Sequence, residues 1–322
     1  MSEFEMIETY FAPLTMGNEG SAGLKDDAAV IDIPDGHELV VTSDTLNEGI
    51  HFLEGEKPEN IARKALRVNL SDLVSMAATP ICYQLNIAFP EKPKDDWLRA
   101  FSDALHADNR AFSIYCSGGD TTSIKGDLLS ISITAMGSVP KGKAIRRGGA
   151  KDGDAIIVTG ALGDAVLGLK VLQEGLDETE YKNAVARYRV PEPRVGVENI
   201  LHKYVNAAAD ISDGLLADCM NIAKASGLGA DIDISKIAFS DDVMRAIQRK
   251  IITTEQVIKG GDDYELILAI SAEHVGLAIS ELRRINLKPQ LIGLFKDSTL
   301  NLNLSNADDL NIDSSKLGWE HF

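Results

Sequence analysis

The sequence is poor in cysteine, in aromatic residues and in positive charge. Its 322 residues include three cysteines, two tryptophans and 6% aromatic residues in all, while 32 Lys and Arg stand against 49 Asp and Glu. Cys82, Cys116 and Cys219 form no CxxC pair, which argues against disulfides and zinc and predicts buried thiols. The net charge of −17 repels nucleic-acid backbones and anionic membranes, so we expect neither as a main partner.

Long hydrophobic runs are also missing. No stretch approaches the roughly 20 apolar residues that a membrane helix needs. Residues 1–6 lack the cationic start and apolar core of a signal peptide, so we expect a cytoplasmic protein. The contents of 44% hydrophobic and 25% charged residues are typical of globular proteins, and the length suggests roughly two domains.

Helical and strand-like patterns are mixed in both halves of the chain, which predicts an α/β or α+β fold. A Gly-, Lys- and Arg-rich stretch at residues 141–153 interrupts them, and we expect domains at residues 1–144 and 145–322. The stretch includes most of a near-match to the phosphate-binding P-loop, but Ala144 stands where a Ser or Thr must bind magnesium. The expected helices cover residues 3–11, 60–78, 95–111, 162–174, 179–188, 193–205, 215–225 and 272–285, and the expected strands 28–33, 38–42, 81–89, 113–116, 128–139, 155–159, 232–234, 264–270 and 291–295.

One pattern recurs four times along the chain: an aspartate in a small or polar context at the end of an apolar, strand-like run. A single aspartate of this kind is usually a turn or helix-cap residue. Its recurrence argues against coincidence, as does a further aspartate in the middle of helix 60–78, where a lone carboxylate is unfavourable. The aspartates are Asp44, Asp120, Asp210 with Asp213, and Asp262; Asp27 opens another run, and Asp72 lies in the helix.

These residue types suit a metal-dependent phosphate site. Carboxylates at strand ends can converge on one edge of a sheet, where loops build sites. Oxygen ligands without His or Cys clusters suit magnesium, which bridges to substrate phosphates. The glycine pairs before Asp120 and Asp262 let the backbone approach a phosphate closely. Magnesium would also offset the repulsion between this acidic chain and a phosphate ester.

Taken in order, these motifs resemble those of the thiamine-monophosphate kinase family, within an ATP-binding superfamily that includes aminoimidazole ribonucleotide synthetase and selenophosphate synthetase. The resemblance spans nearly the whole chain. The motifs that carry it are residues 26–30 (DDAAV), 43–45 (SDT), 51–52 (HF), 69–73 (NLSDL), 118–122 (GGDTT), 210–215 (DISDGL) and 260–266 (GGDDYEL).

The resemblance implies ATP-dependent phosphorylation of thiamine monophosphate to thiamine diphosphate, the final step in making that cofactor. Phosphoryl transfer needs positioning and charge neutralisation rather than covalent help, so we expect direct in-line transfer. The family implies a homodimer in which the N-terminal four-stranded sheet pairs with its mate's to form a central β-barrel. It also implies a C-terminal α/β domain that completes the active-site cleft.

The resemblance also implies roles for individual residues. Asp120, Arg147 and Asp213 are expected to be catalytic; alignment favours Arg147 over Arg146. A tryptophan in the thiamine pocket could stack on the cationic thiazolium. The expected ligands of several magnesium ions are Asp27, Thr42, Ser43, Asp44, Asp72, Asp120, Asp210 and Asp213; the expected ATP contacts are Gly119, Asp120, Arg147 and Ser212; and the expected thiamine-phosphate contacts are His51, Asp262 and Trp319.

Two departures from the family pattern are present. Lys25 stands where the family commonly has glycine, and Asp262 where it usually has glutamate, so Asp263 or Glu265 could take the substrate-side role instead. Two other functions stay open from the residues. One is a sister ATP-dependent enzyme acting on another phosphorylated or carbonyl metabolite. The other is a non-catalytic acidic protein that metal ions stabilise.

Overall fold

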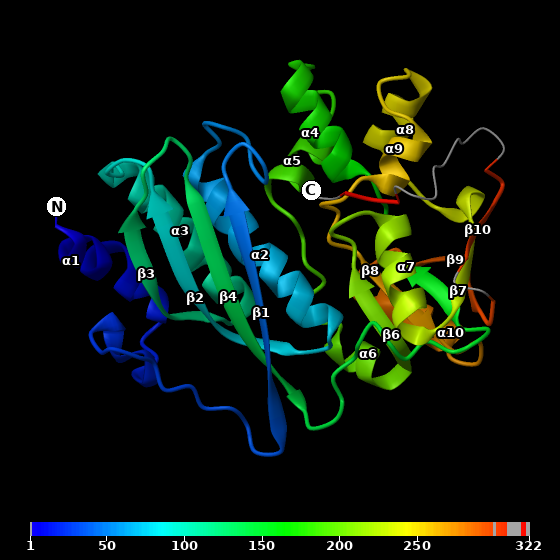
Figure 1. Cartoon of the computed structure of the whole chain (residues 1–322), viewed down its shortest axis with the longest axis horizontal. Helices are drawn as coiled ribbons and strands as arrows, with labels where there is room; N and C mark the ends of the chain where they lie inside the picture. Colours follow the sequence, from blue (N-terminus) through cyan, green and yellow to red (C-terminus); the bar gives the residue numbers. More distant parts are fainter. Residues whose placement is uncertain (1, 299–300, 308–316, 320–322) are drawn as a thin grey trace. The chain divides into compact units, whose positions relative to one another are not determined.

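The computed structural model describes residues 2–298, 301–307 and 317–319. The chain divides into two compact units (Figure 1). Unit 1 comprises Met1–Val74 and Ala78–Ala144, and unit 2 comprises Ser75–Ala77 and Ile145–Phe322. Each unit contains one β-sheet with helices, so the expected two-domain α/β class is confirmed.

Unit 1 is built on a mixed four-stranded sheet in the order β1-β4-β2-β3. Strands β2 and β3 run parallel, and the other neighbours are antiparallel. Side chains along β2 alternate: Leu85, Ile87 and Phe89 are buried, while the residues between them are more accessible. Such alternation is typical of a sheet covered on one face. The strands are β1 (His37–Asn47), β2 (Thr79–Phe89), β3 (Tyr115–Ser123) and β4 (Ser130–Pro140).

Two long helices cover the apolar face of this sheet, and Figure 1 shows both behind the four strands. They are α2 (Pro58–Ser75) and α3 (Asp95–Phe112), which confirms the helices expected there. The chain leaves α2 through Ala77 in the left-handed conformation (φ 57°), and the N–H of Ala78 bonds to the carbonyl of Leu73. Such a left-handed residue is a common helix stop. The N-terminal segment contains α1 (Glu3–Met6), the π-helix η1 (Ile7–Phe11), and the 3-10 helices η2 (Ala12–Thr15) and η3 (Glu19–Leu24).

The strand expected at residues 28–33 is wrong. Within the described part of the chain this segment has no partner strand, and the N–H of Val30 bonds to the carbonyl of Gly20 in the preceding 3-10 helix. Val30 is 73% exposed. An apolar run predicts a strand only if a neighbour completes its hydrogen bonds, and here none does.

Two expected strands are too short, which moves two aspartates away from strand ends. Strand β1 continues to Asn47, so Asp44 lies within it and pairs with Ile133. Strand β3 continues to Ser123, so Asp120 also lies within a strand, paired with Asn86. Their small and polar neighbours look like loops locally, but pairing with β4 and β2 keeps them extended.

Unit 2 contains a six-stranded sheet in the order β10-β7-β9-β5-β8-β6. All neighbours are antiparallel except the parallel pair β10 and β7. The central strands β5 and β8 are buried along their whole length, because they have neighbours on both sides and a core on their faces. The strands are β5 (Ala155–Val158), β6 (Val205–Asp210), β7 (Gly229–Asp233), β8 (Leu266–Ile270), β9 (Gln290–Lys296) and β10 (Leu302–Ser305).

The helices of unit 2 depart from expectation at three places. The helix expected at residues 193–205 begins only at Glu198, because the preceding segment contains Pro193 and Gly196. Helices α8 and α9 were not expected, although Ser240 and Thr253 cap them through side-chain hydrogen bonds. The helices are α4 (Asp164–Glu174), α5 (Lys182–Arg189), α6 (Glu198–Tyr204), α7 (Leu215–Ser226), α8 (Asp241–Gln248), α9 (Thr254–Lys259) and α10 (Val275–Arg284), with the 3-10 helix η4 (Ile234–Lys236).

The structure also describes the state of the cysteines and the character of the helices. Cys82, Cys116 and Cys219 are free and buried, as predicted. Burial raises the pKa of the Cys116 and Cys219 thiols to about 12, so neither is a ready thiolate. In the part of the chain that the structure describes, none of the helices combines the length and the apolar character required to traverse a bilayer.

Candidate active site

A carboxylate pair ties the sheet of unit 1 to helix α2. Asp44 lies on β1 and Asp72 on α2. The hydroxyl of Thr42 donates to Oδ2 of Asp72 at 2.5 Å, and the N–H of Asp44 donates to Oδ1 of Asn69 at 3.1 Å. The amide nitrogen of Asn69 in turn donates to the Ala65 carbonyl at 3.0 Å. The strand therefore meets the helix through polar contacts at this point.

The electrostatics of this pair would favour a bound cation. Burial, and then the negative charge of Asp72, raise the pKa of Asp44 to about 6. Two partly buried carboxylates close to each other disfavour the state in which both are ionised. A divalent cation would remove this repulsion. The donors are all oxygens, and magnesium is commonly held by one or two carboxylates, with water and phosphate oxygens in the remaining positions. The residues present fit that ion.

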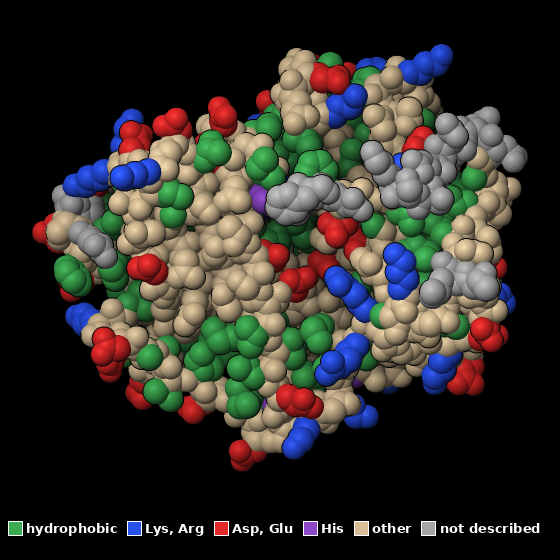
Figure 2. Space-filling view, in the orientation of Figure 1, with side chains coloured by type: hydrophobic (Ala, Val, Ile, Leu, Met, Phe, Trp, Pro, Cys, Tyr) green, Lys and Arg blue, Asp and Glu red, His purple; other side chains and the backbone are tan. Residues whose placement is uncertain are grey.

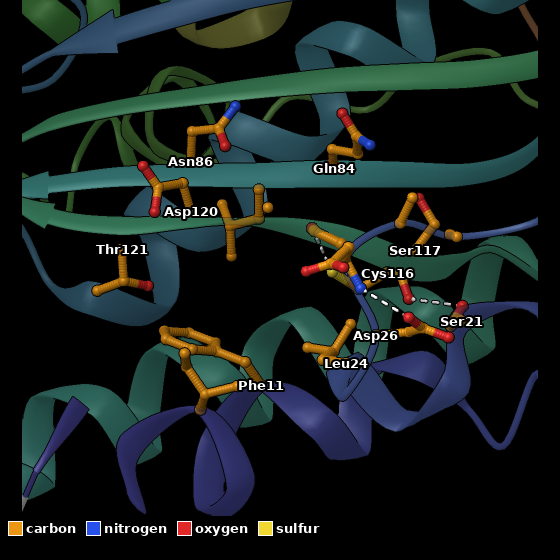
Figure 3. A pocket seen from close by; sticks show the side chains of 17 residues that line it. Phe11, Ser21, Leu24, Asp26, Gln84, Asn86, Cys116, Ser117, Asp120 and Thr121 are labelled. Carbon is orange, nitrogen blue, oxygen red and sulfur yellow. Dashed lines mark hydrogen bonds between the residues drawn. The ribbon is translucent and has the colours of Figure 1, made fainter. Parts of the chain in front are cut away.

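A second group of the expected residues lines a cavity of about 260 Å³ in unit 1 (Figure 3). Asp27, Gly119 and Asp120 contribute to its wall, as do the apolar side chains of Phe11 and Leu24. The N–H of Asp27 is held by Oδ1 of Asp26 at 2.9 Å. The cavity therefore combines carboxylates and glycine backbone with apolar surface.

Gly119 is required by the close approach of two strands. Its φ is 150°, and a Cβ at this position would lie 1.8 Å from the carbonyl oxygen of Leu85. Any other residue would push β3 away from β2. The sequence analysis expected this glycine to let the backbone approach a phosphate, whereas the close approach in the structure is to the neighbouring strand β2.

The register places Asp44 and Asp120 on opposite faces of the sheet. Asp120 pairs with Asn86, which pairs with Ser132, which pairs with Thr45. Directly paired residues point to the same face, and the hydroxyls of Thr45 and Ser132 indeed lie 2.6 Å apart. Asp44 is the residue before Thr45, so it points to the other face, toward α2.

The unit-1 carboxylates consequently form separate groups. Among residues 2–298, 301–307 and 317–319, no three His, Cys, Asp or Glu side chains come together as a metal cluster. The Asp44–Asp72 pair and the cavity with Asp27 and Asp120 are two places on the sheet. Ser43, an expected magnesium ligand, directs its hydroxyl to the Ile133 carbonyl and the Thr134 hydroxyl.

His51 lies in the turn that follows β1. Its Nδ1 accepts the N–H of Asn47 at 3.0 Å. Neutral His51 therefore carries its proton on Nε2, which makes Nε2 a hydrogen-bond donor. The ring is partly buried, and this turn is closed by a bridge between Glu48 and Phe52.

In unit 2, three chain segments meet at the end of strand β6. Asp210 ends the strand, and Ser212 and Asp213 form the loop that enters α7. The carbonyl of Ser212 accepts the N–H of Asp262 at 2.9 Å, and the carbonyl of Asp213 accepts the N–H of Trp319 at 2.9 Å. The structure therefore brings together five residues for which the sequence analysis proposed separate roles: Asp210, Ser212, Asp213, Asp262 and Trp319.

Two glycines allow these segments to come so close. A Cβ at Gly261 would lie 2.0 Å from the carbonyl oxygen of Ser212. A Cβ at Gly214, whose φ is 120°, would lie 2.5 Å from the carbonyl oxygen of Lys259. Side chains at either position would separate the loops.

The backbone at Asp262 is strained. Asp262 has φ 72° and Tyr264 has φ 51°, conformations that non-glycine residues rarely adopt. The hydroxyl of Tyr264 donates to Oδ1 of Asp262 at 3.0 Å, which orients the carboxylate. Strain of this kind persists where surrounding contacts enforce it, and it gathers at functional sites.

Neither neighbouring acid is available to replace Asp262. Both carboxylate oxygens of Asp263 accept the N–H of Gly163, at 3.0 and 2.9 Å. Glu265 accepts hydrogen bonds from Thr159, Arg187 and Arg194 in the interior. Both acids support the fold of this region, which leaves Asp262 as the candidate on the substrate side.

The positive charge of Arg147 acts on Asp218, a buried carboxylate of α7 that lies beside this loop. Burial raises the pKa of Asp218 to about 6, and the charge of Arg147 acts against that rise. Asp218 in turn holds the N–H groups of Ser212 and Asp213, at 3.1 and 3.0 Å. Sequence reasoning missed Asp218. The available signal was an aspartate at an apolar position of a helix, the same argument that singled out Asp72.

Comparisons with known proteins match both units. Residues 25–139 match the family model for AIR synthase related protein, N-terminal domain, and residues 151–300 match its C-terminal domain. Thiamine-monophosphate kinase of Caulobacter vibrioides is 36% identical over 323 residues, which cover 99% of this chain and 91% of that protein. The chain belongs to the thiamine-monophosphate kinase family.

Solved structures of the thiamine-monophosphate kinase family share the fold. The enzyme from Stenotrophomonas maltophilia matches with a TM-score of 0.84 at 34% identity, covering 92% of this chain and 96% of that one. A structure of AaThiL complexed with AMPPCP and TMP matches with a TM-score of 0.78 at 27% identity, covering 92% and 91%. The family resemblance inferred from the sequence motifs is thereby confirmed.

Proposed function

We propose that the chain transfers the terminal phosphoryl group of ATP to thiamine monophosphate, giving thiamine diphosphate and ADP. The observation that carries this proposal is the Asp44–Asp72 carboxylate pair, whose oxygen donors suit a hard cation, in a member of the thiamine-monophosphate kinase family. A relative that binds AMPPCP, an analogue of ATP, together with TMP supports both substrates.

Magnesium is the expected cofactor, bound as several ions. Thr42, Asp44 and Asp72 would hold one ion, and Asp27 and Asp120 offer a second place on the sheet of unit 1. Asp210 and Asp213 offer a third in unit 2. When bound, magnesium supplies the positive charge that lets phosphates approach this acidic protein. Since the hydroxyl of Ser43 bonds to β4, its side chain is the weakest candidate among the expected ligands.

The cavity beside Asp120 suits a nucleotide. Phe11 and Leu24 offer apolar surface for a base, while Gly119 and Asp120 lie on the same wall. Ser212 and Arg147 in unit 2 are proposed as further phosphate contacts. The guanidinium of Arg147 would offset negative charge as the phosphoryl group moves.

Thiamine monophosphate is expected to contact Asp262, Trp319 and His51. The Trp319 side chain is 58% exposed, and its backbone N–H bonds to the carbonyl of Asp213, so we expect the accessible part of its ring to stack on the cationic thiazolium. We expect the Asp262 carboxylate, which accepts a hydrogen bond from Tyr264, to bind a cationic or hydrogen-bonding group of this substrate. Nε2 of neutral His51 can donate to a phosphate oxygen.

The transfer itself is proposed to be direct and in line. Both donor and acceptor are phosphate anions, so the protein's task is to align them and offset their charge. A phosphoenzyme would instead exchange label between ADP and ATP without thiamine monophosphate. We expect no such exchange with purified protein, and exchange at the rate of turnover would contradict direct transfer.

The chain is also proposed to act as a homodimer in which two sheets form a barrel. On strand β1 the accessible face carries Leu39, 44% exposed, and Val41, 54% exposed. Figure 2 shows apolar side chains gathered over the lower ends of β1 and β4. A second copy would bury this surface. Sedimentation should show a dimer that Val41→Lys dissociates and Leu277→Lys, in α10, does not; a wild-type monomer would contradict the barrel.

The direct test of function is product analysis. Purified protein, ATP, magnesium and thiamine monophosphate should yield thiamine diphosphate and ADP in equal amounts. Thiamine and phosphorylated ribonucleotides should yield no product, which would separate this activity from the sister enzymes. Absence of thiamine diphosphate above a control without enzyme would overturn the proposal.

A further inference from the structure

Asp218 is a buried carboxylate that the proposed reaction does not use. It lies in the first turn of α7 and is fully inaccessible to solvent. Its Oδ2 accepts the N–H of Ser212 at 3.1 Å and the N–H of Asp213 at 3.0 Å. Two backbone amides on a single carboxylate oxygen fix the orientation of the peptide groups that carry Ser212 and Asp213.

The carbonyls of the same two residues are also occupied. Ser212 accepts from the backbone of Asp262, and Asp213 accepts from the backbone of Trp319. Those contacts are made by loops, whereas Asp218 is part of a helix whose Leu215, Leu216 and Cys219 are buried in the core of unit 2. Asp218 therefore connects the loop to a helix that is anchored in the core of unit 2.

The charge of Asp218 has two further compensating groups beside it. The side-chain amide of Asn221 approaches its other oxygen at 3.4 Å, and the positive charge of Arg147 acts on it. A buried carboxylate is tolerated only when such partners compensate its charge. Loss of Asp218 would leave two amides without an acceptor and Arg147 without this counter-charge.

We propose that Asp218 is a positioning residue for the metal- and phosphate-binding loop at residues 210–213. It holds the loop so that the carboxylates of Asp210 and Asp213 face the same ion. The inference rests on the proposed function, because that function gives the loop its magnesium. Supporting residues of this kind typically change metal affinity or activity by about 10–100-fold when removed.

The chain offers a closely matched control. Asp242 is also buried, accepts two backbone N–H groups, from Asn183 at 3.1 Å and Ala184 at 3.3 Å, and is paired with Arg245. It lies in the same unit, in α8, and holds the start of α5 rather than the 210–213 loop. Asp218→Ala and Asp242→Ala should both lower the melting temperature, but they should differ in metal dependence.

The experiment compares full-length Asp218→Ala, Asp218→Asn, Asp242→Ala and Asp213→Asn with wild type. The magnesium concentration for half-maximal activity should rise about tenfold in Asp218→Ala and stay within about twofold in Asp242→Ala. Asp218→Asn, which keeps an acceptor oxygen, should restore part of the loss. Equal magnesium dependence of Asp218→Ala and Asp242→Ala would overturn the proposal.

Binding of Mn²⁺, followed by electron paramagnetic resonance, separates this inference from the kinase assignment. The isotherm of Asp218→Ala should shift toward that of Asp213→Asn, and that of Asp242→Ala should overlay wild type. These results would support the positioning role even if the wild-type protein formed no thiamine diphosphate. If Asp218→Ala does not fold, Asp218→Asn carries the comparison, and a wild-type isotherm for it would contradict the role.

Discussion

Replacing Asp72 with asparagine should stabilise the metal-free protein while weakening its response to magnesium. The pKa of Asp44 rises from 3.8 to about 6, first through burial and second through the charge of Asp72. A shift of this size corresponds to about 3 kcal/mol. Because burial is the larger cause, removing the Asp72 charge should return about 1 kcal/mol, or about 2–4 °C in melting temperature.

The stability of the metal-free protein should also depend on pH. A carboxyl with a raised pKa in the folded state binds more protons there than in the unfolded state, so stability falls as pH rises from 3.8 to about 6 and levels off above that. The carboxylate pair should therefore make the metal-free wild-type protein less stable at pH 7 than near pH 5. Asp72→Asn should reduce this pH dependence, because it removes the negative charge beside Asp44. The hydrogen bond from Thr42 can remain, since the asparagine oxygen is also an acceptor.

The assay is thermal unfolding in EDTA and in saturating magnesium, between pH 5 and 8. The matched control is Asp108→Asn in the same unit, where both carboxylate oxygens accept from Arg67, at 2.7 and 2.8 Å. Breaking that buried pair should destabilise the protein by about 3–5 kcal/mol. A lower melting temperature for Asp72→Asn in EDTA, or an undiminished magnesium shift, would refute the reasoning about the carboxylate pair.

Three further substitutions test the role of Asp120, the stacking of Trp319 and the close approach of the backbone at Gly261. Asp120→Asn should lower kcat by about 10²–10³-fold, the usual effect of losing charge stabilisation in the transition state. The melting temperature should not change, because the Asp120 side chain is exposed. Near-normal turnover would show that Asp120 is not part of the site. Trp319→Ala should raise the KM for thiamine monophosphate about 2–30-fold and that for ATP less, whereas equal increases would argue against stacking. Gly261→Ala should disrupt the Asp262 loop and lower activity, because its Cβ would lie 2.0 Å from the Ser212 carbonyl oxygen. Gly276→Ala should be tolerated, since its Cβ would meet no atom within 4 Å. Similar losses of activity in both variants would mean that the close approach is unimportant.

Periodicity predicted the elements whose burial follows a simple repeat. Helices α2 and α3 and strand β4 lie where their apolar spacing placed them. The segment at residues 28–33 has the same composition as a strand but lacks a neighbour, and composition does not show which run finds a partner. Strand β1 extends through Ser43, Asp44 and Thr45 because β4 pairs with it, a contact between residues far apart in sequence.

The candidate site was predictable as a set of residues but not as an arrangement. Family motifs named Asp44, Asp72 and Asp120 together, yet the strand register separates Asp120 from the other two. In unit 2, backbone hydrogen bonds between distant loops bring Asp213, Asp262 and Trp319 together, and such bonds leave no local sequence signal. Asp218 did leave one, a carboxylate at a buried helical position.

The central claim is that this acidic chain uses magnesium to phosphorylate thiamine monophosphate. It is tested most directly with ATP labelled in the terminal phosphate, incubated with thiamine monophosphate and purified protein. Magnesium-dependent transfer should place the label in thiamine diphosphate when magnesium is present, and thiamine diphosphate should carry no label when magnesium is chelated. Label that stays in ATP or appears only in inorganic phosphate, with magnesium present, would contradict it.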